Sequence, residues 1–208
     1  MKLACDFDEA YVEVESSPQF LPYVGGEPAR LELCALAAKR SLGFALTAGL
    51  DPWIAAERID VDVRGAEYID SFPGEIRLQA VGDGASHWSA GTVIRDGGAI
   101  IVMNPLHTRE RQKVTLAEEL AHLVMGHPPC AIDAARGFRT FYEDVEDEAY
   151  GVGGAMVVPY AQLFWLAKKG VRAADIARQF GTSARFVDYR INRAGLRKMY
   201  RKQLRGVA

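Results

Sequence analysis

Cysteine is scarce in this chain, which has three in 208 residues, Cys5, Cys34 and Cys130. Three widely spaced cysteines are too few for a disulfide framework, and they lack the close spacing of a thiolate zinc site. We therefore expect them to be reduced and structural.

Long uncharged apolar segments are also missing. The longest apolar stretch, residues 31–50, is interrupted by Glu32, Lys39 and Arg40, so we do not expect it to span a bilayer. No cleavable signal precedes it. We expect a cytoplasmic location and no membrane partner.

The chain as a whole lacks an excess of either charge, since its formal net charge is -2. This balance conceals two halves of opposite sign. Residues 160–208 hold 12 Lys and Arg against Asp175 and Asp188, a net charge of +10, while residues 1–159 hold 13 basic and 25 acidic side chains, a net charge of -12. A basic half of this kind predicts a DNA or acidic protein partner, or docking against the acidic half of the same chain.

Apolar residues recur at helical spacing between residues 108 and 127. Leu116, Leu120, Leu123 and Val124 follow one another at one-, three- and four-residue steps, which predicts a helix with one buried face. Gly126 is a natural stop for this helix.

Inside this helix, Glu118 and His122 lie four residues apart and therefore on one face, with Glu119 one step further round. The arrangement is close to the His-Glu-x-x-His helix that binds zinc and supplies a general base, with Glu118 in place of the first histidine. A carboxylate oxygen binds zinc at about the same distance as an imidazole nitrogen, roughly 2.0 to 2.2 Å. Glu118 is thus either a ligand or an ordinary solvated residue, and a site with two carboxylates makes manganese a competitor of zinc.

The segments before this helix predict a mixture of helices and antiparallel strands. Residues 1–30 alternate briefly and are otherwise rich in proline and glycine, which predicts a surface arm or an edge strand. We further expect a buried helix at residues 31–47, a short helix at 53–58 capped by Asp51, strands at 59–63 and 75–81, and a hairpin of residues 92–94 and 99–104.

A second helix of the site is expected from Tyr142 to Val158. Its acidic first turns suit the positive end of a helix dipole. Gly151, Gly153 and Gly154 each cost about 1 kcal/mol in helix propensity, which indicates that another helix comes very close there.

Residues 160–208 are helical throughout in their apolar pattern, with glycine breaks at Gly170 and Gly181. Thr182 or Ser183 is available as the N-cap of the helix after Gly181. A third helix is expected to carry Val187, Ile191 and Leu196. The short helices around Gly181 predict a helix-turn-helix-like unit.

These features together resemble the ImmA/IrrE family of bacterial metallopeptidases. The resemblance covers roughly residues 30 to 200 and rests on three segments: the hairpin end IVMN (101–104), RQKVTLAEELAHLVMGH (111–127) and EAYGVGGAMVVP (148–159). With the order of elements, it implies an α+β fold. We expect an N-terminal arm at 1–30, a small zincin-like metallopeptidase domain at 31–159 and a basic helix-turn-helix-like helical domain at 160–208.

The resemblance also implies zinc, with Glu118, His122 and Glu148 at the positions of the metal ligands and Glu119 at that of the general base. His127, just beyond Gly126, is a further candidate for the missing nitrogen ligand, or it supports or caps the site.

Selective cleavage of a protein substrate, a transcriptional repressor, is the activity that the resemblance implies. The alternative is a catalytically weak or inactive regulator that binds DNA or a partner protein through residues 160–208. A toxin or immunity component is a third hypothesis.

Overall fold

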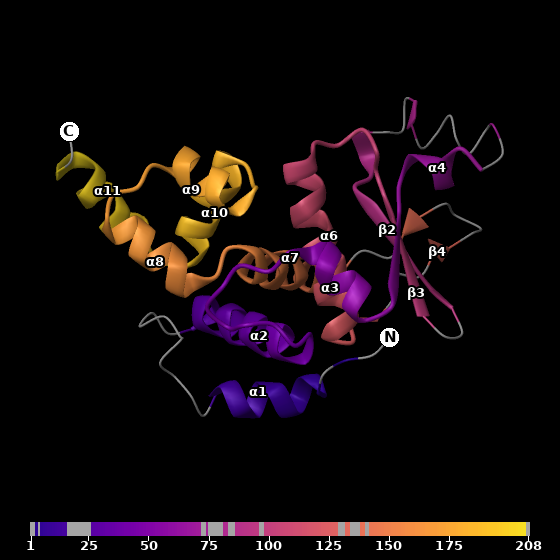
Figure 1. Ribbon diagram of the computed structural model, residues 1–208, viewed down its shortest axis with the longest axis horizontal. Coiled ribbons are helices and arrows are strands. Elements are labelled where there is room, and N and C mark those ends of the chain that lie inside the picture. Colours follow the sequence, from indigo (N-terminus) through magenta and orange to yellow (C-terminus); the bar gives the residue numbers. More distant parts are fainter. Residues whose placement is uncertain are drawn as a thin grey trace.

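The computed structural model describes residues 3, 5–15, 26–71, 74, 81–82, 86–95, 98–128, 132–133, 138–139 and 142–206 (Figure 1). Its helices are α1 (Phe7–Glu15), α2 (Glu27–Ser41), α3 (Pro52–Arg58), α4 (Ala66–Ile69), α6 (Arg109–Val124), α7 (Glu143–Val157), α8 (Tyr160–Lys168), α9 (Ala173–Phe180), α10 (Ala184–Arg193) and α11 (Arg197–Gly206). Its strands are β1 (Val61–Arg64), β2 (Ala90–Arg95), β3 (Gly98–Met103), β4 (Ile132–Asp133) and β5 (Phe138–Arg139). Within these residues, no helix combines the length and hydropathy that crossing a bilayer requires.

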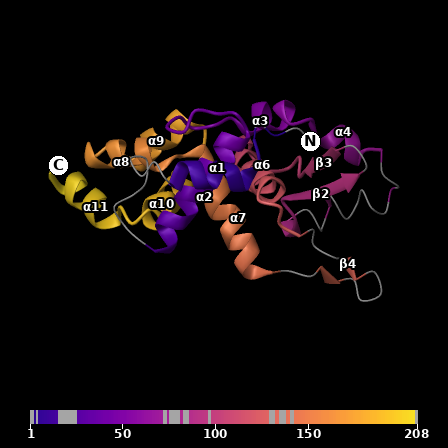
Figure 2. The ribbon, with the colours of Figure 1, turned by 90° about the horizontal axis from the view of Figure 1, so that it is seen from below.

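A three-stranded sheet lies at one end of the molecule and helices α8 to α11 at the other, with α6 and α7 between them (Figures 1 and 2). The fold is therefore mixed α and β and mostly helical. The sheet has the order β1-β3-β2, and β4 and β5 form a separate short pair.

The predicted hairpin is confirmed, since β2 and β3 pair antiparallel from Arg95 opposite Gly98 to Ala90 opposite Met103. The expectation of an antiparallel sheet was wrong for β1, which pairs with β3 in parallel. More than thirty residues separate the two strands in the chain, enough for the crossover that a parallel pair needs. The strand expected at residues 75–81 falls outside the described residues except for Val81.

The N-terminal segment contains a helix where an arm or edge strand was expected. Residues 7–15 form α1, with Ala10 and Val14 buried. Phe7, Tyr11 and Val14 follow one another at helical spacing, and all three pack against buried residues. Tyr11 and Val14 therefore belong to one face of a helix. The five residues from Tyr11 to Glu15 are too few to distinguish the helical period of about 3.6 from the strand period of about 2.

The motif helix α6 lies within the predicted residues 108–127 and ends just before Gly126, the predicted stop. The hydroxyl of Thr108 accepts a hydrogen bond from the backbone N–H of Arg111, as an N-cap does. Gly126 has a φ of 69° just after the helix, a left-handed conformation that suits glycine.

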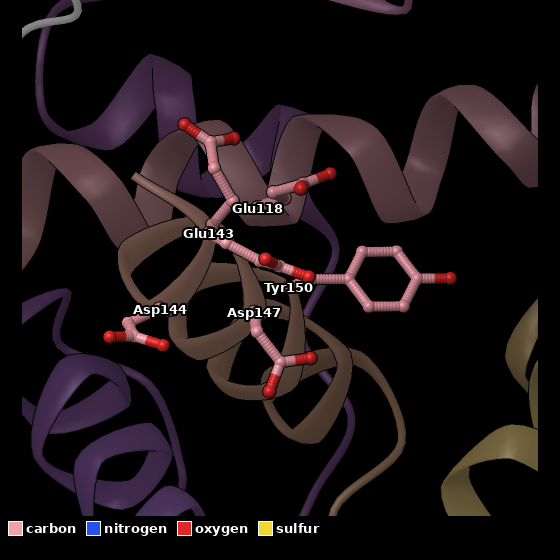
Figure 3. A pocket seen from close by; sticks show the side chains of 6 residues that line it. Glu118, Glu143, Asp144, Asp147 and Tyr150 are labelled. Atoms are coloured by element: carbon pink, nitrogen blue, oxygen red, sulfur yellow. The ribbon is translucent and has the colours of Figure 1, made fainter. Parts of the chain in front are cut away.

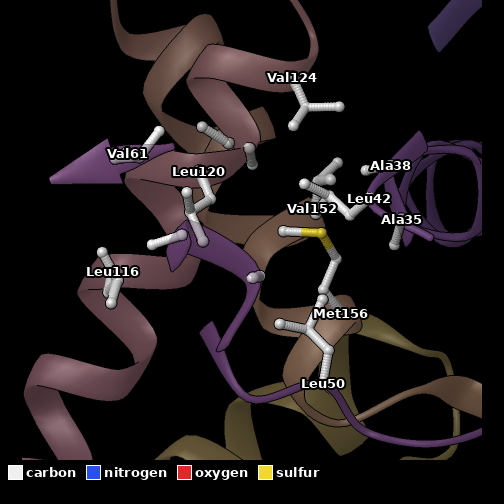
Figure 4. Close-up of a cluster of buried hydrophobic side chains, with 14 of the residues drawn as sticks. Ala35, Ala38, Leu42, Leu50, Val61, Leu116, Leu120, Val124, Val152 and Met156 are labelled. Carbon is white, nitrogen blue, oxygen red and sulfur yellow. The ribbon is translucent and has the colours of Figure 1, made fainter. Parts of the chain in front are cut away.

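The main core joins α2, α6 and α7 with the inner side chains of the sheet (Figure 4). Leu116 and Leu120 of α6 are fully buried, as is Met156 of α7. The labelled side chains around them are Ala35, Ala38, Leu42, Leu50, Val61, Val124 and Val152. The core thus covers one face of α6 and leaves the face of Glu118 and His122 for the site.

Helices α8 to α11 share a second core with α6 and α7. It includes Val114 and Ala117 of α6 and Val157 of α7, together with Leu163 of α8 and Ile191 of α10. Burial of this apolar surface, at about 25 cal/mol per Å², holds the C-terminal helices against the helices of the site.

The turns between these helices follow the predicted signals. Gly170 and Gly181 both have positive φ, and the Ser183 hydroxyl caps α10 by accepting from the backbone N–H of Phe186. The expected third helix is split, because Gly195 has a φ of 71° and Leu196 lies between α10 and α11.

The outline of α9, turn and α10 matches the expected helix-turn-helix, but α10 is not a free recognition helix. Phe186, Val187, Arg190 and Ile191 are all buried. A separate helix-turn-helix domain is therefore not shown.

Candidate metal centre at the crossing of α6 and α7

α6 and α7 cross at Gly153. A side-chain carbon there would lie 2.6 Å from the backbone nitrogen of Glu118 and 2.7 Å from the carbonyl oxygen of Ala117, so the crossing requires glycine. Glu146 precedes Gly153 by seven residues, about two turns, and lies on the same side of α7. Glu148 is only five residues away and is rotated by about 140° from that side.

An open hollow of about 450 Å³ lies between α6 and the first turns of α7. It is lined by Glu118 of α6 and by Glu143, Asp144, Glu146, Asp147 and Tyr150 of α7. Figure 3 shows Glu118 on one of the two crossing helices and Glu143, Asp144, Asp147 and Tyr150 on the other. Five carboxylates in one hollow produce a negative potential that attracts cations.

Tyr150 is the only neutral side chain that lines this hollow in the described part of the chain. Burial, with the nearby Tyr189 and Glu118 as smaller causes, raises the pKa of its hydroxyl to about 12. The hydroxyl therefore stays protonated at neutral pH and remains a hydrogen-bond donor beside the acidic side chains.

His122 joins this hollow to the end of α6. Its Nε2 lies 3.7 Å from Oε2 of Glu146. Its Nδ1 lies 3.0 Å from Nδ1 of His127, whose backbone N–H donates to the carbonyl of His122 at 3.0 Å. One nitrogen of His122 thus faces a carboxylate of the hollow, while the other is held by a second imidazole.

Glu148 lies on the other side of this histidine pair. Its Oε2 is 3.3 Å from Nε2 of His127, and its Oε1 forms an ion pair with Arg30 of α2. Four side chains therefore connect in a row behind Glu146: His122, His127, Glu148 and Arg30. The predicted ligands Glu118 and His122 share one face of α6, but Glu148 reaches His127 rather than His122.

Glu146, which lies 3.7 Å from His122, was not among the residues singled out in the sequence. A signal for it was present: once Gly153 is recognised as the point of close approach, the side of α7 that faces α6 follows from the helical period. Glu146 lies on that side and Glu148 does not.

If Nε2 of His122 offers its lone pair to a metal ion, the contacts among His122, His127 and Glu148 allow one consistent placement of protons. Nδ1 of His122 then carries the proton and donates to Nδ1 of His127. Nε2 of His127 is protonated in turn and donates to the Glu148 carboxylate. This is the order in which a partner fixes the tautomer of a metal-binding histidine.

Glu119 lies one residue further round α6 and faces the sheet. The hydroxyl of Thr92 on β2 donates a hydrogen bond to Oε2 of Glu119 at 2.5 Å. This places the predicted general base beside β2, an edge of the three-stranded sheet.

The donors around His122 suit a divalent metal ion in type. Two tetrahedral ligands at about 2.0 to 2.1 Å from zinc lie about 3.3 Å apart, and the 3.7 Å between His122 Nε2 and Glu146 Oε2 is close to this value. Glu118 adds a carboxylate to the same hollow. Among the described residues, however, no three such side chains already stand at ligand distances from one point. The carboxylates would have to close on the ion.

The fold and this site define a small metallopeptidase-like domain, with a motif helix crossing a glycine-rich helix beside a sheet. A family model described as the IrrE N-terminal-like domain, Peptidase_M78, matches residues 78–192. This match spans more than half of the chain, which therefore belongs to the ImmA/IrrE family and carries its zincin-like metallopeptidase domain. The matched segment extends through α8 and α9 into α10. No curated protein gives a significant match to the chain.

Proposed function

We propose that the protein is a metal-dependent peptidase that cleaves an extended segment of a protein substrate. The observation that supports this most is the setting of His122, with Nε2 facing Glu146 at 3.7 Å and Nδ1 held by His127 at 3.0 Å. The predicted base, Glu119, precedes His122 by three residues, so the two side chains are neighbours on the surface of the helix.

The metal ligands in this proposal are His122, Glu146 and Glu118. Glu148 belongs in the outer row, because Arg30 and His127 bind its two carboxylate oxygens. Zinc or manganese bound here would polarise a peptide carbonyl and lower the pKa of water.

The substrate has a suitable docking edge at β2. This strand has β3 on one side and no strand on the other among the described residues. Val93 and Ile94 are exposed large apolar residues on it. An extended peptide can add to such an edge through backbone hydrogen bonds and place its side chains on the exposed residues.

A peptide bound along β2 would pass beside Glu119. The carboxylate can take a proton from an attacking water and later return it to the leaving amine. Thr92 orients the carboxylate through the 2.5 Å hydrogen bond. For the substrate we propose a transcriptional repressor, as the family resemblance implies, in a regulatory response.

A second candidate function is that of a regulator that binds its partner without cleaving it. Glu118 favours this candidate, because two carboxylates with one imidazole neutralise the +2 charge of the ion and weaken its action on a carbonyl. Cleavage and metal binding must therefore be measured separately.

Metal content tests the site. Purified protein would be dialysed against zinc or manganese, and the bound metal measured by mass spectrometry for Glu146→Gln and Glu148→Gln, two matched changes on one helix. We expect Glu146→Gln and His122→Ala to lose stoichiometric metal and Glu148→Gln to keep it. If Glu148→Gln lost the metal and Glu146→Gln kept it, Glu148 would be the ligand and Glu146 would be excluded.

Cleavage is tested by the new N-termini that appear when the protein is added to a cell extract. Wild-type protein should generate termini that are absent with Glu119→Gln, a variant expected to retain its metal because Glu119 is not a ligand. Identical termini for both proteins, with metal bound to both, would favour the regulator.

A further inference from the structure

The basic charge of the C-terminal helices divides into a paired and an unpaired part. Among the residues that the structure describes, four of the 12 Lys and Arg of residues 160–208 form ion pairs. Arg172 and Arg178 pair with Asp175. Arg190 pairs with Glu32 at 2.5 Å, and Arg193 pairs with Glu27 and Asp147.

The three ion pairs that Arg190 and Arg193 of α10 form account for part of the charge division, because they join the basic C-terminal helices to acidic residues of the same chain. Arg190 is 1% exposed and also donates to the carbonyl of Val158 at 3.0 Å. Arg193 reaches the acidic start of α7 through Asp147. The basic residues of α10 that a recognition helix would use are therefore engaged, except for Arg185, which is exposed.

The unpaired cations are concentrated on α11. Its five exposed cationic residues are Arg197, Lys198, Arg201, Lys202 and Arg205. At about 100° per residue they fall within an arc of about 140°. No carboxylate of the described residues forms an ion pair with them, and no acidic residue follows Asp188 in the sequence.

The opposite side of α11 is occupied by the protein itself. Tyr200 is buried in the second core, where Met199 and Leu204 also pack. The hydroxyl of Tyr200 donates to the carbonyl of Val171 at 3.0 Å, which ties α11 to the turn between α8 and α9. The helix is thus fixed with its cations outward.

α8 extends this surface. α8 and α11 lie side by side at the end of the molecule away from the sheet (Figures 1 and 2). Lys168 and Lys169 are exposed at the end of α8, and Trp165 is 57% exposed. Nζ of Lys168 lies 5.0 Å from the centre of the Trp165 ring. We call these three residues and the five cations of α11 the α8–α11 basic face.

We propose that the α8–α11 basic face binds the phosphate backbone of duplex DNA without reading its sequence. A helix of ten residues is about 15 Å long, and duplex DNA presents about one charge per 1.7 Å of axis. Several phosphates therefore lie within reach of the α11 cations. Trp165 adds a flat aromatic surface at the edge of the contact.

A duplex fits this face better than a membrane does. A helix that lies on a membrane inserts its apolar side, but the apolar side of α11 is packed in the core. A single exposed tryptophan offers little apolar surface beside seven cations. The surface is thus suited to an extended polyanion.

The test is fluorescence anisotropy of a labelled duplex with the full-length protein, from about 50 to about 200 mM salt. Binding should weaken with salt at about 0.9 logarithmic units per phosphate contact. Arg201→Gln/Lys202→Gln should reduce that slope by about 2. Quenching of tryptophan emission on binding should be lost in Trp165→Phe, which keeps Trp53 and Trp88.

The matched control is Arg172→Gln/Arg178→Gln, which removes the same charge from exposed residues already paired with Asp175. It should leave the slope unchanged. No duplex binding at low salt, or equal losses in the two double variants, would overturn the proposal. Binding to vesicles of anionic phospholipid without binding to duplex would also overturn it.

Discussion

The backbone nitrogen of Glu118 lies so close to Gly153 that a side-chain carbon at Gly153 would stand 2.6 Å from it. Both groups belong to backbone in the middle of helices, so neither can move aside alone. This contact determines how near α7 comes to α6 and which of its acidic residues face His122.

Gly153→Ala should therefore destabilise the protein. Forcing a methyl group into a packed contact costs typically 1 to 3 kcal/mol, against a gain of about 1 kcal/mol in helix propensity. Gly151→Ala is the control, because its nearest neighbours are the movable methyl groups of Leu31. Thermal unfolding should show a lower Tm for Gly153→Ala than for Gly151→Ala. Equal Tm values would contradict the close contact.

The sequence predicted most of the elements that surround the site. The end of α6 followed from Gly126 and the start of α3 from Asp51, because capping and turn residues act locally. The parallel pairing of β1 with β3 could not be predicted in this way. It depends on the path of the chain between them, which no local pattern records.

Glu118 and His122 share the face of α6 that the sequence predicted, whereas the sequence did not reveal that Glu148 lies beside His127. Glu118 and His122 stand four residues apart on one helix, so their common face followed from the helical period. The choice among Glu143, Glu146 and Glu148 depended on how α7 is rotated against α6. That rotation is set by a contact between two helices, which the acidic run itself does not reveal.

Lys39 predicts a dependence of stability on pH. The side chain is fully buried and donates to the carbonyl of Leu46 at 2.6 Å and to that of Ala48. Burial lowers its pKa from 10.5 to about 8, an effect that Glu32 opposes. Between these two values the unfolded chain binds the proton more strongly, so the free energy of unfolding should rise with pH. The free-energy cost of burying the charged amine is fully present below about pH 8 and absent above about pH 10.5.

Urea unfolding of wild type and Lys39→Met across this window isolates the effect. Burial also raises the pKa of the Cys34 thiol to about 11, which has the opposite sign, but this contribution is common to both proteins. The difference in free energy should change with pH between about 8 and 10.5. A constant difference would show that the amine keeps its ordinary pKa.

Glu118→His should tighten zinc binding, because it replaces an anionic ligand with an imidazole and leaves more positive charge on the ion. Competition with a chromogenic chelator would measure the change in Kd. Manganese, which prefers oxygen ligands, should gain less or lose affinity. An unchanged zinc Kd would mean that residue 118 does not contact the metal.

His127→Ala should weaken metal binding without abolishing it. His127 holds Nδ1 of His122 at 3.0 Å and is itself held by Glu148 at 3.3 Å, so it orients the ligand rather than acting as one. Loss of such a supporting partner typically costs 10- to 100-fold in metal affinity. His127→Gln, which keeps a hydrogen-bonding group, should recover part of the loss, whereas Glu146→Ala should remove binding. Complete loss of metal in His127→Ala would instead identify His127 as the nitrogen ligand that replaces the missing histidine.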